Sequence, residues 1–112
     1  MKLTHELHNK KATLRLEGNF TYTQRKPFQE MLKTICTDQV EEVVIDLSQV
    51  AFLDSAALGL LMISHRQLEA ERRKLSLAYP QATVRQILEL ANLHKTIPIV
   101  DVVVSSPARK SA

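Results

Sequence analysis

Residues 43–63 decide the fold of this chain and read Val-Val-Ile-Asp-Leu-Ser-Gln-Val-Ala-Phe-Leu-Asp-Ser-Ala-Ala-Leu-Gly-Leu-Leu-Met-Ile. The first five are mostly apolar and rich in β-branched side chains, which is typical of a strand buried on both faces. The polar pair Ser48-Gln49 predicts a turn, and a second apolar patch leads to Asp54 and Ser55. From Ala56 onward alanine, leucine and methionine dominate, and these residues favour a helix. The stretch therefore predicts a strand, a turn and a helix that begins at Ser55.

Ser55 is the candidate functional residue, because its hydroxyl stands at the exposed start of a helix directly after an acid. The simplest interpretation is an N-cap, in which the hydroxyl accepts a hydrogen bond from a free amide of the first helical turn. On that interpretation Ser55→Ala costs about 0.5–2 kcal/mol of stability. The alternative is a hydroxyl that serves the function of the protein. Spacing alone favours the cap.

Size and composition limit the possible classes of protein. The chain has 112 residues, 45% hydrophobic and 24% charged, which is enough for one domain with a real core. The longest apolar segment is broken by Asp54 and Ser55, and the first residues lack a signal-peptide run. One cysteine, Cys36, excludes an internal disulfide and fits a reducing compartment. We therefore expect a cytoplasmic protein that does not enter a membrane.

The basic residues give no clear sign of nucleic-acid binding, because the formal net charge is only +3. Most of them are scattered along the chain. Arg72-Arg73-Lys74 is the exception, and we interpret it as a solvated helix end favoured by the helix dipole. We expect no nucleic-acid partner.

Alternating apolar residues predict a first hairpin, with strands around residues 3–7 and 12–16, each with one buried face. Residues 9–11 form its turn, and Gly18 closes the second strand. A helix that starts near Thr23 follows, with Pro27 in its first turn and a 3.6-residue apolar period through residues 28–35. We thus expect two antiparallel strands and a helix before residue 43.

After the helix that begins at Ser55, alternation over residues 75–79 predicts another strand. Thr83 can cap a third helix, and Asn92 can end it in the left-handed conformation. Residues 97–100 predict a short edge strand, because Pro98 cannot donate to a ladder, and residues 102–104 extend it. Strands alternating with helices after a hairpin predict an α/β fold, a mixed β-sheet with helices packed mainly on one side.

Catalytic chemistry is not indicated by any motif. A Gly-x-Ser-x-Gly elbow is missing, and the only glycines, Gly18 and Gly59, cannot build a phosphate-binding loop. The four histidines (His5, His8, His65 and His94) do not have the spacing of metal ligands. We therefore predict that the protein is not an enzyme and needs no metal or cofactor.

The run Asp54-Ser55-Ala56-Ala57-Leu58-Gly59, preceded by a Val-Ile-Asp-Leu strand, resembles the signature of the STAS family. This family contains anti-sigma factor antagonists and domains of sulphate transporters. The resemblance extends from the first strands to Ile97-Pro98-Ile99. It implies a single STAS domain over residues 1–104, and the small, polar and basic residues 105–112 are expected to form a flexible tail.

The resemblance implies that Ser55 is phosphorylated by a partner-switching kinase. The partner-binding residues would be Asp54, Ser55, Ala56, Leu58 and Gly59. The implied partners are an anti-sigma factor that is also a serine kinase, and a phosphatase; the absence of a heptad seam predicts a monomer or weak dimer. The alternative function is a structural STAS subunit of a signalling assembly or a lipid-transport complex, without phosphorylation.

The segment after the second predicted strand departs from the pattern of the family that the chain resembles. Many antagonists carry an aspartate shortly after the glycine that ends the second strand, whereas this chain has Asn19-Phe20-Thr21-Tyr22 there.

Gly59 lies inside a helix, where it costs about 1 kcal/mol relative to alanine. We expect either that another backbone approaches Gly59 closely, or that the glycine is simply tolerated.

Overall fold

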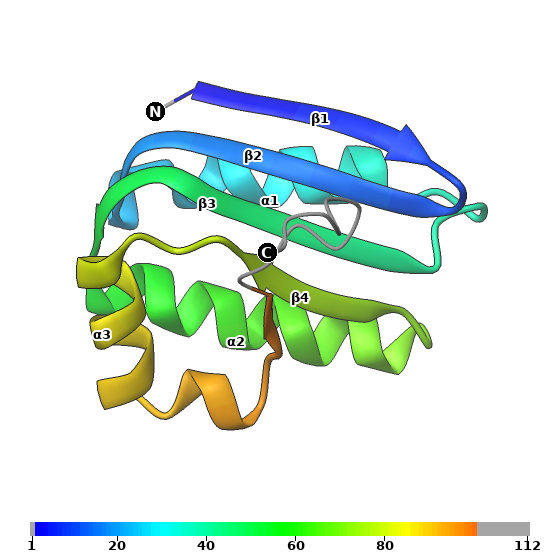
Figure 1. The fold of residues 1–112 in the computed structure, drawn as a ribbon. Helices are drawn as coiled ribbons and strands as arrows, with labels where there is room; N and C mark the ends of the chain where they lie inside the picture. Colours follow the sequence, from blue (N-terminus) through cyan, green and yellow to red (C-terminus); the bar gives the residue numbers. More distant parts are fainter. Residues whose placement is uncertain (1, 101–112) are drawn as a thin grey trace, which may run out of the picture.

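The computed structural model describes residues 2–100 and contains one five-stranded sheet with three α-helices (Figure 1). In chain order the elements are β1 (Lys2–His8), β2 (Lys11–Phe20), the 3₁₀ turn η1 (Tyr22–Gln24), α1 (Arg25–Ile35), β3 (Glu42–Leu53), α2 (Ser55–Ala70), β4 (Lys74–Ala78), α3 (Ala82–Leu90), the 3₁₀ turn η2 (Leu93–Lys95) and β5 (Ile99–Val100). The predicted α/β class with a mixed sheet is confirmed. The predicted strand extension at 102–104 and the tail at 105–112 lie outside the described residues.

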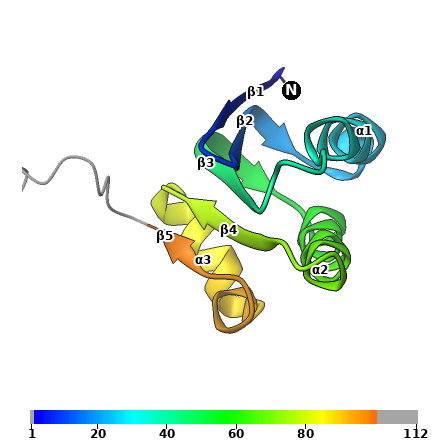
Figure 2. The same ribbon diagram turned by 90° about the vertical axis from the view of Figure 1, so that its right-hand side faces the viewer.

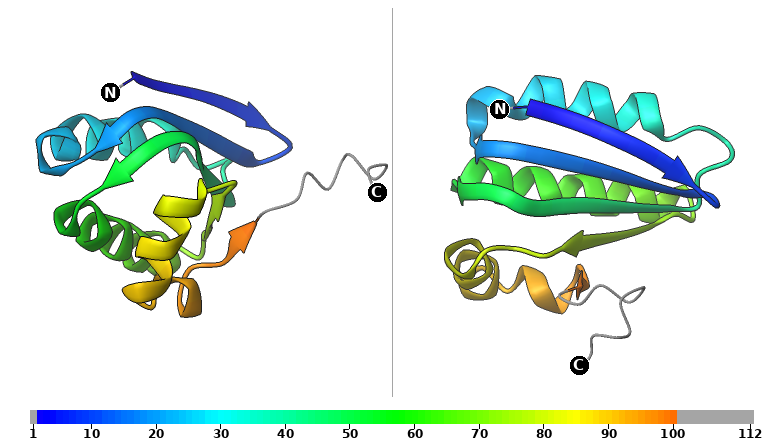
Figure 3. Two further views of the ribbon diagram at one scale, coloured as in Figure 1. Left: turned by 60° about the vertical axis from the view of Figure 1, so that its left-hand side comes forward. Right: turned by 45° about the horizontal axis from the view of Figure 1, so that its top comes forward.

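The strand order β1-β2-β3-β4-β5 follows the sequence, with β1 antiparallel to β2 and every later pair parallel. Crossovers between parallel strands are right-handed, so a sheet that grows in one direction places its crossover helices on one face. Figure 2 shows α1 and α2 side by side on one side of the sheet. Figure 3 shows β1 at one edge and the segment from α3 to β5 at the other. The largest fully buried side chains are Phe20, Phe28, Leu14, Leu16, Ile45, Leu47, Leu53, Leu61, Leu77, Leu88, Ile97 and Val43.

The β1–β2 hairpin is confirmed, although its details differ from the prediction. Asn9 and Lys10 both have positive φ (49° and 66°), as the central residues of a type I′ turn require, and Lys11 already belongs to β2. The predicted buried face of β1 is wrong. Only Leu3 reaches the core, whereas Leu7 is 53% exposed, because β1 is the edge strand.

β3 is one continuous strand of 12 residues, so the predicted turn at Ser48-Gln49 is wrong. The pairing with β2 is irregular instead, since β3 advances three residues while β2 advances two between the pairs Arg15–Asp46 and Glu17–Gln49. The Asp46 carboxylate accepts a hydrogen bond from Ser48 N at 2.9 Å inside this bulge. A bulge bends a strand without ending it. The polar pair therefore marks a bend in β3.

The sequence predicted that Gly18 closes β2. This is wrong, because β2 continues to Phe20. Gly18 has φ of 108° and stands at a second irregularity of the β2–β3 pairing. Glycine adopts this conformation without the steric cost that other residues meet. Together the irregularities let Phe20 pair with Leu53, which brings the ends of both strands to the same edge of the sheet.

The elements after α2 follow the predicted order with three corrections. β4 does not alternate, because Leu75 to Ala78 are all buried, and it ends before Tyr79, whose φ is 53°. α3 begins at Ala82, so Thr83 is not its cap; the preceding Gln81 donates its side-chain amide to Ser48 O at 2.9 Å. Asn92 adopts the predicted left-handed conformation, and β5 is a confirmed edge strand.

Arg73 is not part of a solvated helix end, and this corrects the interpretation of Arg72-Arg73-Lys74. α2 ends at Ala70, and the Arg73 side chain is only 13% exposed. Its Nε donates to Val40 O at 2.9 Å and its Nη2 to Thr37 O at 2.8 Å, while Nη1 pairs with Glu71. The guanidinium thus joins the loop before β3 to the loop after α2, a contact between segments that are 33 to 36 residues apart.

We expect Arg73→Met to lower the free energy of unfolding by about 1–3 kcal/mol, because it leaves the carbonyls of Val40 and Thr37 without their charged donor. Arg72→Gln is the matched control, since Arg72 is exposed and should change stability by less than about 0.5 kcal/mol. Urea denaturation of the three proteins measures both values. Equal midpoints for Arg73→Met and the control would contradict the role assigned to Arg73.

Candidate functional site

The junction between β3 and α2 is built around the carboxylate of Asp54. Asp54 has an extended backbone (φ −100°, ψ −180°), and its Oδ1 accepts from Ala57 N at 2.9 Å. Asp54 is therefore the N-cap of α2, and the prediction that Ser55 is the cap is wrong. An extended residue just before a helix points its side chain back over the free amides of the first turn, and here that residue is Asp54.

Ser55 is the first helical residue, and it is exposed. With the cap supplied by Asp54, the hydroxyl is not needed to begin the helix. The first turn of α2 contains no acidic residue, and the N-terminal end of a helix carries a partial positive charge. The structure thus places an accessible hydroxyl where an added anion would be electrostatically favoured.

The second oxygen of Asp54 joins α2 to the segment after β2. Oδ2 accepts from Tyr22 N at 3.0 Å, and Asp54 N donates to Phe20 O at 3.3 Å. Tyr22 is 58% exposed, and the Arg25 guanidinium carbon lies 5.1 Å from its ring centroid, a cation–π distance. Tyr22 and Arg25 therefore belong to the same surface as Asp54.

Sequence reasoning did not identify Tyr22 and Arg25 as part of this site. It noted the segment 19–22 only because an expected aspartate was missing there. The available signal was topological, since the carboxyl ends of adjacent parallel strands lie at the same edge of a sheet. That rule would have placed the residues after β2 beside those after β3.

The other predicted partner-binding residues divide between surface and core. Gly59 is exposed and Ala56 half-buried, whereas Leu58 is half-buried and packs against the core. A Cβ added to Gly59 would meet nothing within 4 Å, so the expected close approach of another backbone is wrong and the glycine is simply tolerated. Gly59 lies about one helical turn after Ser55.

Exposed apolar side chains occur on α2 and near the end of β3, the strand that leads into it. Ile63 is 50% exposed and Phe52 is 46% exposed. Ser55, Gly59 and Ile63 recur every four residues, so they lie on one side of the helix. This side of α2 therefore presents a hydroxyl, a glycine and one exposed apolar side chain.

Within residues 2–100 no group of three or more histidine, cysteine, aspartate or glutamate side chains is placed to hold a metal ion. In the same part of the chain, no helix is long and apolar enough to cross a membrane. The site thus consists of the Ser55 hydroxyl, the Asp54 carboxylate and the neighbouring Tyr22 and Arg25 side chains.

This fold and this junction define a class of small α/β domains, and sequence comparison identifies the class. The profile of the STAS domain family matches residues 3–106. The chain belongs to the STAS domain family.

Two curated relatives cover most of the chain. A STAS-domain containing protein of Pseudomonas aeruginosa is 28% identical over 87 residues, which are 78% of this chain and 85% of the relative. The anti-sigma F factor antagonist of Paenibacillus polymyxa is 24% identical over 102 residues, 90% of this chain and 87% of the relative. Among solved structures, the phosphorylated form of the Bacillus cell fate determinant SpoIIAA has a TM-score of 0.72 at 19% identity, covering 99% of this chain and 100% of that chain.

We expect Asp54→Ala to cost about 1–3 kcal/mol, because it removes the cap on Ala57 N and the charged acceptor of Tyr22 N. Ser55→Ala should change stability by less than about 0.5 kcal/mol, since alanine is a good helix former and Ser55 caps nothing. Thermal melts of both variants and the wild type measure this difference. A larger loss for Ser55→Ala than for Asp54→Ala would restore Ser55 as the cap.

Proposed function

We propose that this protein is an anti-sigma factor antagonist whose binding is switched by phosphorylation of Ser55. Unmodified, it binds an anti-sigma factor that is also a serine kinase, and so frees the sigma factor. Phosphorylated on Ser55, it is released, and a phosphatase restores the binding form. The observation that carries this proposal is the exposed Ser55 hydroxyl at the first position of α2, beside an aspartate that already supplies the cap.

The function of one related protein and the phosphorylated form of another support the proposal. The Paenibacillus polymyxa relative is an anti-sigma F factor antagonist. The Bacillus protein SpoIIAA, which shares the fold, exists in a phosphorylated form. These likenesses support phosphorylation as the regulatory chemistry of this family member. They support a binding protein that is a substrate of a kinase and not itself an enzyme, and we place it in the cytoplasm.

The energetics of the site suit such a switch. A phosphate on Ser55 would add about −1.5 to −2 charges at neutral pH. The free amides of the α2 N-terminus favour that charge, and the carboxylate of Asp54 opposes it. These effects act in opposite directions on the folded state, so the fold should survive phosphorylation.

The docking surface, by contrast, should not tolerate the phosphate. Gly59 and Ile63, on the same side of α2 as Ser55, are exposed and uncharged, and the charged group of the neighbouring segment is Arg25. A partner that covers this surface would have to remove the phosphate from water, and that desolvation is costly even when an oppositely charged group is near. Release therefore follows from desolvation and requires no change of fold.

We expect Ser55→Ala to bind the partner like the wild type and to accept no phosphate. Ser55→Asp should keep a folded α2 and bind the partner at least about tenfold more weakly, a loss of about 1.4 kcal/mol or more. The partner is first captured from native lysate with the wild-type protein and identified by mass spectrometry, which also reads the mass of the Ser55 peptide. Calorimetric titration with the purified partner then gives the affinities.

Gln39→Glu is the matched control, because it adds one negative charge to an exposed residue in the loop before β3, away from Ser55. It should bind like the wild type. If Ser55→Asp also bound like the wild type, phosphorylation would not act as the switch, and the structural STAS subunit would be the better description.

A further inference from the structure

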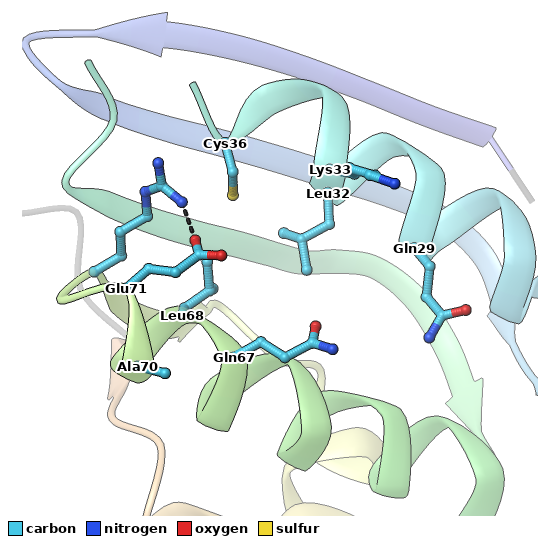
Figure 4. Close-up of a pocket in the computed structure, with 9 residues that line it drawn as sticks. Gln29, Leu32, Lys33, Cys36, Gln67, Leu68, Ala70 and Glu71 are labelled. Atoms are coloured by element: carbon cyan, nitrogen blue, oxygen red, sulfur yellow. Dashed lines mark hydrogen bonds and ion pairs between the residues drawn. The ribbon is translucent and has the colours of Figure 1, made fainter. Parts of the chain in front are cut away.

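A second site lies at the opposite end of α2 from Ser55. A cavity of 560 Å³ opens between the C-terminal halves of α1 and α2 (Figure 4). Its volume is within the range of about 300–1,000 Å³ that small-molecule sites occupy. Thirteen residues separate Leu68, which lines the cavity, from Ser55, so about 20 Å of helix lies between the two sites. The cavity is therefore separate from the proposed partner surface.

The floor of the cavity is apolar. Leu32 and Leu68 lie on facing helices and are 6% and 3% exposed, and Cys36 is half-buried beside them. Burial raises the pKa of the Cys36 thiol above its usual value, so the group is uncharged at neutral pH. The floor therefore favours an aliphatic group, and no charge on it opposes one.

The rim of the cavity is polar but carries little negative charge. Gln29 and Gln67 extend toward the opening from the two helices (Figure 4). Glu71 is neutralised by Arg73, which also donates to the carbonyls of Val40 and Thr37. The acid at this rim is thus already paired.

Because Glu71 and Arg73 pair with each other, the ammonium group of Lys33 is the charged group at the rim that a ligand can pair with. It is exposed and lines the cavity, and no ion pair within residues 2–100 involves it. An aliphatic floor, two neutral carboxamides and one available ammonium group are complementary to a molecule with a hydrocarbon part and one negative charge.

We propose that this cavity binds a small amphiphilic carboxylate, with its aliphatic chain on Leu32 and Leu68 and its carboxylate toward Lys33. The site does not depend on Ser55 or on its phosphorylation. The proposed ligand site can therefore be tested independently of the proposed anti-sigma factor antagonism.

Sodium octanoate, used below its micellar concentration, is the probe, and the single cysteine is the reporter. We expect saturating octanoate to slow alkylation of Cys36 by iodoacetamide at least about threefold, since the ligand would cover the thiol. The assay runs near pH 9, because the raised pKa of Cys36 makes the thiolate scarce at neutral pH. Amide chemical shifts should change in the C-terminal halves of α1 and α2 and not around Ser55.

Lys33→Gln should weaken octanoate binding by up to about fivefold, the range expected for one exposed ion pair, and should leave binding of 1-octanol unchanged. Lys26→Gln is the matched control, because Lys26 is also an exposed lysine of α1 but does not line the cavity. It should bind octanoate like the wild type. Gln29→Trp, at another exposed position, should fill the opening and abolish protection of Cys36.

Three results would overturn the proposal. One is unchanged alkylation of Cys36 at saturating octanoate. Another is shift changes spread over the protein without saturation, which would mean non-specific adsorption. The third is equal protection of Cys36 by octyltrimethylammonium, because the site would then recognise a hydrocarbon chain without regard to charge.

Discussion

The junction between β3 and α2 depends on the hydrogen bonds that the carboxylate of Asp54 accepts. One oxygen caps α2 through Ala57 N, and the other holds Tyr22 N at the start of η1. Three chain segments, the end of β3, the start of α2 and the segment after β2, therefore meet at one side chain. This arrangement leaves the neighbouring Ser55 hydroxyl free of a capping role and exposed. The structural task and the proposed regulatory task fall on adjacent residues.

The two ends of α2 are fixed by opposite charges. At its N-terminus a carboxylate accepts from backbone amides, and beyond its C-terminus the guanidinium of Arg73 donates to backbone carbonyls. Each group forms hydrogen bonds with backbone N–H or C=O groups that have no partner within the helices and strands. Such groups need a hydrogen-bond partner when they are removed from water. Because Arg73 draws the loop before β3 toward the end of α2, it also borders the cavity between the helices. The cavity between the helices thus lies beside the long-range contacts of Arg73.

The sequence predicted the order and type of the elements because apolar periodicity and turn residues are local signals. It failed where two distant segments decide the outcome. Ser48-Gln49 looks like a turn, yet the pairing of β3 with β2 keeps it in the strand, and Asp46 satisfies the bulge. Asp54 and Ser55 are both good cap residues, so the choice between them depended on the backbone angle at Asp54. Arg73 looked solvated because its partners lie more than 30 residues earlier in the chain.

The segment after β2 changes the electrostatics of the proposed switch. Many antagonists carry an aspartate in this segment, whereas this chain has Asn19-Phe20-Thr21-Tyr22, and Arg25 lies over the ring of Tyr22. Because Tyr22 N is bound to Asp54, this pair is fixed at the same surface as Ser55. A phosphate on Ser55 would then meet the repulsion of Asp54 alone and not that of a second carboxylate, while a guanidinium stands in the neighbouring segment. In the proposed switch, the departure from the family pattern would lower the cost of phosphorylation to the folded protein, and the charge would then destabilise mainly the complex with the partner.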